Sequence, residues 1–183
     1  MKKGKGLWKR AIGMILAMGL ILSGCGGASG TAGDSGENGK KDSVVFRLNS
    51  EPATLDPQNC SDTGISQQPQ YQLFDSLTRM EQDGTLNLAL AEKLETSEDG
   101  LTMTITIRPD VKFHNGDVMT TDDVEFSLNR AIESKFNTIM TSCFEKAEKI
   151  DDTKVNLYLK YPYGPADKCL ATVNMSILPK AVV

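Results

Sequence analysis

The sequence contains a single histidine and few cysteines, and neither residue type occurs at the spacing of a metal site. The four cysteines, at positions 25, 60, 143 and 169, lie far apart and form no Cys-x-x-Cys pair, and His114 stands alone. Structural zinc sites need closely spaced ligands, so we predict no metal site and no cofactor. His114 precedes an Asn-Gly turn, with no nucleophile motif such as Gly-x-Ser-x-Gly nearby, and we interpret it as a loop residue.

Basic charge and long hydrophobic runs are scarce too. The 183 residues include 20 basic and 24 acidic side chains, and the formal net charge of −4 disfavours nucleic-acid binding, whose footprint is basic. Hydrophobic residues make up 39% of the chain, which is ordinary for a folded protein and excludes both a wholly disordered chain and a polytopic membrane protein. The length is that of one domain or of two small ones.

Residues 1–24 differ from the remainder of the chain. They hold five of the 20 basic residues and none of the 24 acidic ones, and residues 11–22 form an uncharged, mostly apolar run of twelve. This run is short for a membrane-spanning helix, which needs about 20 apolar residues. A basic start followed by a short apolar run is typical of a secretory signal peptide.

The apolar run ends in Leu22-Ser23-Gly24-Cys25, which resembles the lipobox of bacterial lipoproteins. The resemblance implies cleavage before Cys25, lipid on its thiol and new amino group, and anchoring at the outer face of the bacterial cell membrane, on the periplasmic side in a Gram-negative source. An unlipidated signal peptide or a short anchor helix is the alternative. Residues 25–42 are rich in glycine and serine and are predicted to be a flexible tether.

Hydrophobic periodicity in residues 43–183 predicts an α+β domain built from antiparallel hairpins and few helices. Leu101, Met103, Ile105 and Ile107 alternate with threonines, as in a strand with one buried face. Thr120 or Thr121 is expected to cap a helix that ends near Glu133. Further strands are expected over residues 44–48, 77–81, 93–97, 144–150 and 155–159. A helix is expected to start near residues 67–69, with Tyr71, Phe74 and Leu77 as a core stripe. A short helix over about 166–172 and an extended segment over 174–178 are expected to follow.

The body contains an odd number of cysteines, namely Cys60, Cys143 and Cys169. An exported chain of this kind has either one disulfide and one free thiol or, in an anaerobic source, three thiols. Spacing along the sequence does not distinguish the possible pairs.

Several motifs of the body occur in a fixed order. They are residues 54–57 (TLDP), 73–77 (LFDSL), 90–92 (LAE), 94–102 (LETSEDGLT), 107–117 (IRPDVKFHNGD), 120–124 (TTDDV) with Ser127, and 151–155 (DDTKV). In this order they resemble family 5 of the bacterial extracellular solute-binding proteins, the peptide- and nickel-binding receptors of ABC importers.

The resemblance implies a two-lobed, periplasmic-binding-protein-like fold of type II that closes on its ligand by a hinge. Family members are much longer than this chain. Residues 43–183 would therefore be an incomplete, N-terminal part of the binding domain, with residues 43–83 as the start of lobe I and residues 84–183 as a subdomain inserted there.

The same resemblance implies a function in transport and not in catalysis. The expected protein is a lipid-anchored receptor that captures oligopeptides or dipeptides and works with the permease and ATPase subunits of an ABC importer. The alternatives are a receptor for another small solute such as a nickel chelate or a sugar, a truncated product without binding activity, and a surface enzyme. The sequence contains no nucleophile motif or metal-ligand spacing that would support an enzyme.

One loop is expected to contact the ligand. In the peptide binders that the chain resembles, the loop after the first strand faces the cleft, and Thr63, Gly64 and Ile65 match its glycine-apolar pattern. Gly64 would let the backbone of the loop approach a peptide. The loop could then form backbone hydrogen bonds with an extended ligand, as between two paired strands. The alternative is an exposed loop that needs glycine only for its turn.

Overall fold

The computed structural model describes residue 43, residues 45–60 and residues 64–183. The predictions of a signal peptide, of a lipidated Cys25 and of a tether lie outside these residues. The chain divides into two compact units, Met1–Val45 and Phe46–Val183, and every described helix and strand belongs to the second. In the described part of the chain, every helix is too short or too polar to cross a membrane.

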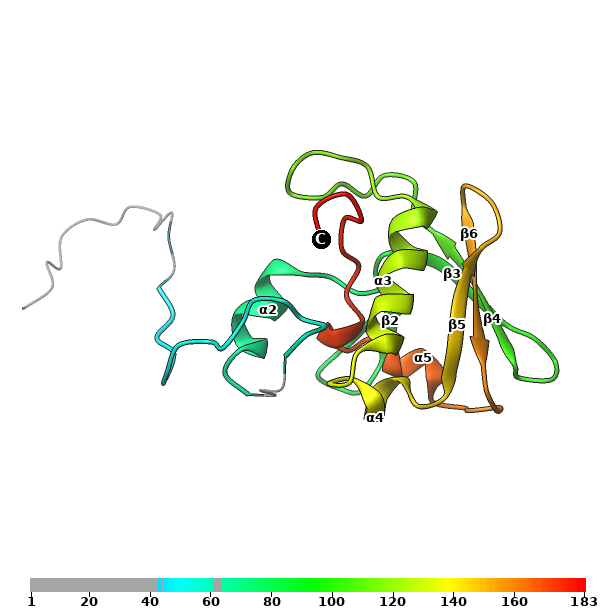
Figure 1. Cartoon of the computed structure of the whole chain (residues 1–183), viewed down its shortest axis with the longest axis horizontal. Helices are drawn as coiled ribbons and strands as arrows, with labels where there is room; N and C mark the ends of the chain where they lie inside the picture. Colours follow the sequence, from blue (N-terminus) through cyan, green and yellow to red (C-terminus); the bar gives the residue numbers. More distant parts are fainter. Residues whose placement is uncertain (1–42, 44, 61–63) are drawn as a thin grey trace, which may run out of the picture. The chain divides into compact units, whose positions relative to one another are not determined.

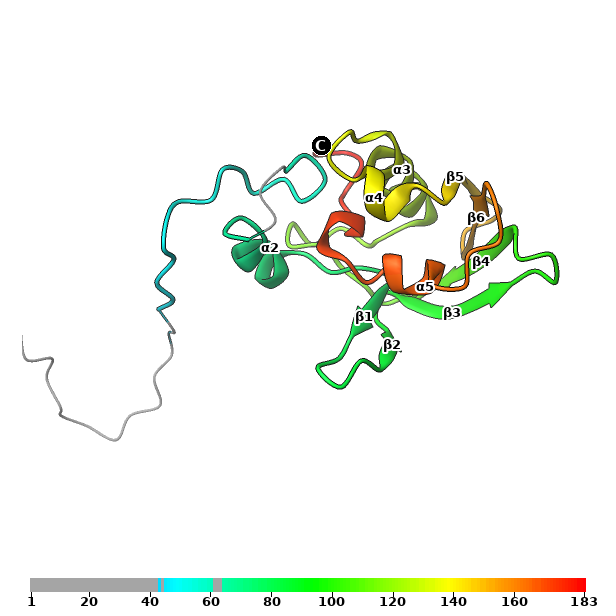
Figure 2. The same ribbon diagram turned by 90° about the horizontal axis from the view of Figure 1, so that it is seen from below.

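The centre of the second unit is an antiparallel sheet of four strands in the order β3-β4-β6-β5, with helix α3 packed on β5 and β6 (Figure 1). A separate hairpin of β1 and β2 projects away from this sheet (Figure 2). The strands are β1 (Thr78–Met80), β2 (Leu86–Leu88), β3 (Ala91–Thr96), β4 (Thr102–Ile107), β5 (Phe144–Lys149) and β6 (Lys154–Leu159). The helices are α2 (Gln67–Leu73), α3 (Thr121–Glu133), α4 (Thr138–Thr141) and α5 (Ala166–Cys169), followed by the 3₁₀ turn η1 (Val173–Met175).

Two predicted hairpins, β3-β4 and β5-β6, are confirmed, and the pairing of β4 with β6 joins them into one sheet. Ile105 lies opposite Val155 in this pairing, and Met103 lies opposite Leu157. Turn signals predict hairpins because their strands are neighbours in sequence, whereas the β4-β6 pair has no such local signal.

The core fills the space between the sheet and α3. In β4 every second residue is buried, which confirms the predicted alternation for Met103, Ile105 and Ile107, whereas Leu101 precedes the strand and is exposed. On the facing side Val124, Leu128 and Ala131 of α3 are fully buried. Asn129 of the same helix completes the backbone bonding of the edge strand β5, because its amide donates to the Ala147 carbonyl at 2.9 Å and its oxygen accepts from Ala147 N at 2.8 Å.

The start of α3 confirms the predicted cap. Thr120 Oγ1 accepts a hydrogen bond from Asp123 N, and the Asp123 carboxylate accepts one from Thr120 N at 2.9 Å, so the two residues form a capping box. Acidic residues at this end also oppose the positive end of the helix dipole.

The turn before β4 requires glycine for two independent reasons. Gly100 has φ +70°, a left-handed conformation that residues with a Cβ rarely adopt. A Cβ at this position would also lie 3.1 Å from Cβ of Pro162, so the turn packs directly on the segment after β6. The predicted Asn115-Gly116 turn is confirmed in the same way, with φ +92° at Gly116.

Two predictions about the N-terminal part of the body are wrong. The described residues 45–48 form no strand, since no described segment pairs with them and Phe46 is 76% exposed. The stripe of Tyr71, Phe74 and Leu77 is not a helix face, because α2 ends at Leu73 and Tyr71 is 55% exposed. The residue that α2 buries is the polar Gln70.

The predictions for the C-terminal segments are confirmed in part. Helix α5 forms where expected but ends at Cys169, three residues early. Residues 173–175 form a 3₁₀ turn instead of an extended segment, and Ser176 Oγ stabilises it by donating to the Val173 carbonyl at 2.7 Å. Met175 and Ile177 are nevertheless buried, so this segment belongs to the core.

Candidate functional site

The predicted ligand loop belongs to a longer segment, residues 53–66, which we call the anchored loop. Its first half is held by an ion pair with α3. Arg130 donates from Nη2 to Asp56 Oδ2 at 2.6 Å and from Nη1 to Asp56 Oδ1 at 3.0 Å, which is the bidentate geometry of the strongest such pairs. The hydrogen bond from Arg130 is the main reason that the pKa of Asp56 lies below its ordinary value.

Gln58 is a deeply buried polar residue of the anchored loop, with 1% exposure. Its amide donates to the carbonyls of Ser127 and Ser176, each at 3.0 Å, and its oxygen accepts from Arg130 Nη1 at 2.9 Å. Burying an amide costs free energy unless it is hydrogen-bonded, and here both ends of the amide are bonded. Gln58 therefore joins the loop to α3 and to the segment after η1.

The first half of the anchored loop is also held by the end of the loop, by α2 and by η1. Ser66 Oγ accepts from Ala53 N at 2.9 Å, so the two ends of the loop lie together. Gln70 donates to the Thr54 carbonyl at 3.2 Å, and Asn174 donates to the Pro57 carbonyl at 2.8 Å. These bonds explain why α2 buries a glutamine instead of an apolar residue.

Thr63, Gly64 and Ile65 belong to the far end of the anchored loop. Thr63 lies outside the described residues. Gly64 is exposed and Ile65 is half-buried, directly before α2 begins at Gln67. Their part in ligand binding stays a prediction.

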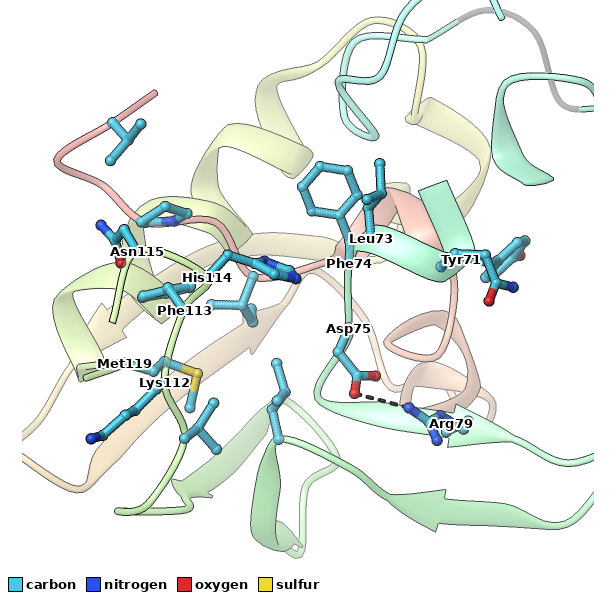
Figure 3. Close-up of a pocket in the computed structure, with 16 residues that line it drawn as sticks. Tyr71, Leu73, Phe74, Asp75, Arg79, Lys112, Phe113, His114, Asn115 and Met119 are labelled. Carbon is cyan, nitrogen blue, oxygen red and sulfur yellow. Dashed lines mark hydrogen bonds and ion pairs between the residues drawn. The ribbon is translucent and has the colours of Figure 1, made fainter. Parts of the chain in front are cut away.

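A hollow of about 490 Å³ lies beside α2 and the loop that carries His114 (Figure 3). Apolar side chains line it, among them Phe74, Phe113 and Met119. Asp75 and Arg79 form an ion pair of 2.9 Å at its rim, with their side chains 43% and 61% exposed.

His114 also lines the hollow and is exposed, in keeping with the predicted loop position. Among the described residues, no group of histidine, cysteine, aspartate and glutamate side chains is arranged to hold a metal ion. The lining is that of a surface for packing or apolar contact.

Sequence reasoning missed Gln58 and Arg130, the two residues that fix the loop. Arg130 lies in the last turn of a correctly predicted helix, and its basic charge there looks like an ordinary helix end. Gln58 follows the motif Leu55-Asp56-Pro57, whose Asp56 proves to be the partner of Arg130. The position of Asp56 within a family motif was the only available signal.

Comparison with known proteins gives a consistent result. The family described as "Bacterial extracellular solute-binding proteins, family 5 Middle" matches residues 85–183. The oligopeptide-binding protein OppA of Bacillus subtilis is 36% identical over 125 residues, which are 66% of this chain and 22% of OppA. The dipeptide-binding protein DppE of the same organism is 34% identical over 140 residues, 74% of this chain and 25% of DppE.

Solved structures agree with this fold. NikA from Brucella suis, in complex with Fe(III)-EDTA, has a TM-score of 0.66 and 26% identity over 74% of this chain and 27% of NikA. AppA from B. subtilis, in complex with a nonapeptide, has a TM-score of 0.63 and 26% identity over 72% of this chain and 26% of AppA.

The chain spans about a quarter of the length of the proteins that it matches. Its α+β fold is that of part of a periplasmic-binding protein, as the motifs predicted. The match to the family over residues 85–183, together with the two curated relatives, establishes that this chain belongs to family 5 of the bacterial extracellular solute-binding proteins.

Proposed function

We propose that this chain is part of a lipid-anchored substrate-binding protein of an ABC importer and that its cargo is a short peptide. Family membership is the observation that carries the proposal, since OppA and DppE are named for oligopeptide and dipeptide binding. The permease and ATPase subunits of the importer are the expected partners. In this proposal residues 43–83 start lobe I and residues 84–183 form the subdomain inserted there.

The anchored loop supports the peptide proposal. Asp56, Gln58 and Asn174 hold its first half in one conformation, so a ligand would meet a loop whose first half is ordered in advance. Preorganisation of this kind lowers the entropic cost of binding. Thr63, Gly64 and Ile65 then offer backbone groups to an extended peptide, with Gly64 permitting the close approach.

A chelated metal is the second candidate cargo. The observation in its favour is the likeness to NikA, whose structure holds Fe(III)-EDTA. A polypeptide loop that bonds through its backbone suits a peptide better than a compact chelate, and this consideration places the peptide first.

Calorimetric titration of the whole gene product separates these cargoes. A pool of tryptic peptides should release heat on binding, whereas Fe(III)-EDTA should give none. Gly64→Val should weaken peptide binding about tenfold, because a branched side chain would hinder the backbone approach. Gly164→Ala is the matched control, since a Cβ at Gly164 meets nothing within 4 Å. Binding of the chelate alone would overturn the peptide assignment, and binding of neither ligand would overturn both cargo assignments.

The lipid anchor has a test of its own. The wild-type chain, expressed in a bacterium that processes lipoproteins, should partition into the detergent phase of a two-phase extraction. Cys25→Ser should move it to the aqueous phase, because serine offers no thiol for the diacylglycerol. Ser23→Ala keeps a small residue in the same tetrapeptide and should still partition into detergent. Detergent partitioning of the Cys25→Ser variant would contradict the anchor.

A further inference from the structure

Cys143 and Cys169 are far apart in sequence and meet in the fold. Cys143 directly precedes β5, and Cys169 is the last residue of α5. The start of β5 and α5 lie at the same end of the sheet (Figure 1). The Cys143 carbonyl accepts from Lys160 N at 2.8 Å, at the end of β6, so the strand, its partner and the following helix converge here.

The two side chains are neighbours in a largely buried place. Cys143 is 1% exposed, Cys169 packs against the hydrophobic core that contains Cys143, and each thiol is close enough to shift the pKa of the other. Thr78 Oγ1 donates to the Asp167 carbonyl at 3.0 Å and fixes α5 to β1. The thiols are therefore held together by elements that are themselves anchored.

The surroundings of the pair disfavour a reactive thiolate. Burial, followed by the neighbouring Cys169, raises the pKa of Cys143 to about 11. Burial and then Asp167 raise the pKa of Cys169. Nucleophilic cysteines need the opposite environment, in which a basic group lowers the pKa. For two neighbouring thiols that are poor nucleophiles, the remaining chemistry is oxidation to a disulfide.

We propose that Cys143 and Cys169 form a disulfide when the protein folds in an oxidising compartment. The family is extracellular, and disulfides persist in that environment. Neighbouring thiols on two anchored elements can form a disulfide by approaching to the bond length of about 2 Å. The bond would close residues 143–169 into a ring that ties the edge strand β5 to α5.

The chemistry needs an oxidant of the disulfide class, such as oxidised glutathione or a thiol-disulfide oxidoreductase. One cysteine thiolate attacks this oxidant, forms a mixed disulfide and releases a thiol. The second cysteine then attacks the mixed disulfide, so the protein gives up two electrons and two protons and the oxidant becomes two thiols. Since the folded thiols are inert, the reaction occurs while the chain folds.

Peptide mapping after refolding tests the pairing. The Cys25→Ser chain is refolded from denaturant with oxidised and reduced glutathione, its remaining thiols are alkylated, and trypsin is added. The sequence places Cys60, Cys143 and Cys169 in separate fragments, residues 48–79, 136–146 and 169–180. We expect a species that joins 136–146 to 169–180 and disappears on reduction. Three alkylated cysteines, or a link to 48–79, would overturn the proposal.

Thermal unfolding gives the second measurement. The oxidised protein should melt about 10 °C above the reduced one, because the ring restricts the unfolded chain. Cys169→Ala should abolish this redox-dependent difference, whereas Cys60→Ala, which removes a buried cysteine outside the pair, should keep it. A redox-dependent difference that survives Cys169→Ala would contradict the assignment. Neither measurement involves a ligand, so the result is independent of the proposed cargo.

Discussion

Gln58→Leu is expected to lower the free energy of unfolding by about 3 kcal/mol, because leucine fills the same buried space without any hydrogen bond. The carbonyls of Ser127 and Ser176 would each lose the amide that now lies 3.0 Å away. Arg130 would lose the oxygen that accepts from its Nη1 at 2.9 Å. Urea unfolding at neutral pH measures the change through the midpoint of the transition.

Gln72→Leu is the matched control, since it makes the same substitution at an exposed position of α2. Its unfolding midpoint should stay close to that of the wild type. Equal midpoints for Gln58→Leu and Gln72→Leu would show that the bonds of Gln58 contribute nothing to stability. The difference between the two variants isolates the buried network from the general effect of replacing glutamine by leucine.

The contrast between Gln58 and Thr120 shows which parts of this fold could be predicted. Thr120 caps α3 through Asp123, three residues away, so a short stretch of sequence is enough to predict its role. The partners of Gln58 lie 69 and 118 positions away, and no sequence pattern near Gln58 predicts them. Local chemistry therefore predicted caps, turns and hairpins, whereas the anchored loop depends on contacts between distant segments.

The failed strand over residues 44–48 has a related cause. Val45 and Phe46 suit a strand by their side chains, but a strand forms only with a hydrogen-bonded neighbour. In the described residues no segment supplies this neighbour. For the site itself, the sequence supplied the position of Gly64 and Ile65 beside α2, while the ion pair that fixes their loop required the three-dimensional structure.

Arg130→Met should lower the free energy of unfolding by about 2 kcal/mol at neutral pH, because methionine replaces the unbranched part of the side chain and removes every donor. Asp56 would keep its half-buried carboxylate without the guanidinium, and removal of one partner from such a pair is costly. Partial exposure of both side chains, 27% and 30%, keeps the effect below that of a fully buried pair. Arg79→Met is the matched control, because its pair with Asp75 is more exposed and should contribute almost nothing.

The dependence on pH distinguishes the ion pair from simple packing by Arg130. The pKa of Asp56 is held below its ordinary value chiefly by the hydrogen bond from Arg130. A depressed folded pKa stabilises the protein above the unfolded value of about 3.9, and the contribution is lost as pH falls through the folded value. The gap in unfolding free energy between wild type and Arg130→Met should therefore be full at pH 6 and shrink below pH 4. An equal difference in unfolding free energy at pH 6 and at pH 3 would show that Arg130 acts by packing. It would contradict the conclusion that the ion pair with Asp56 stabilises the anchored loop.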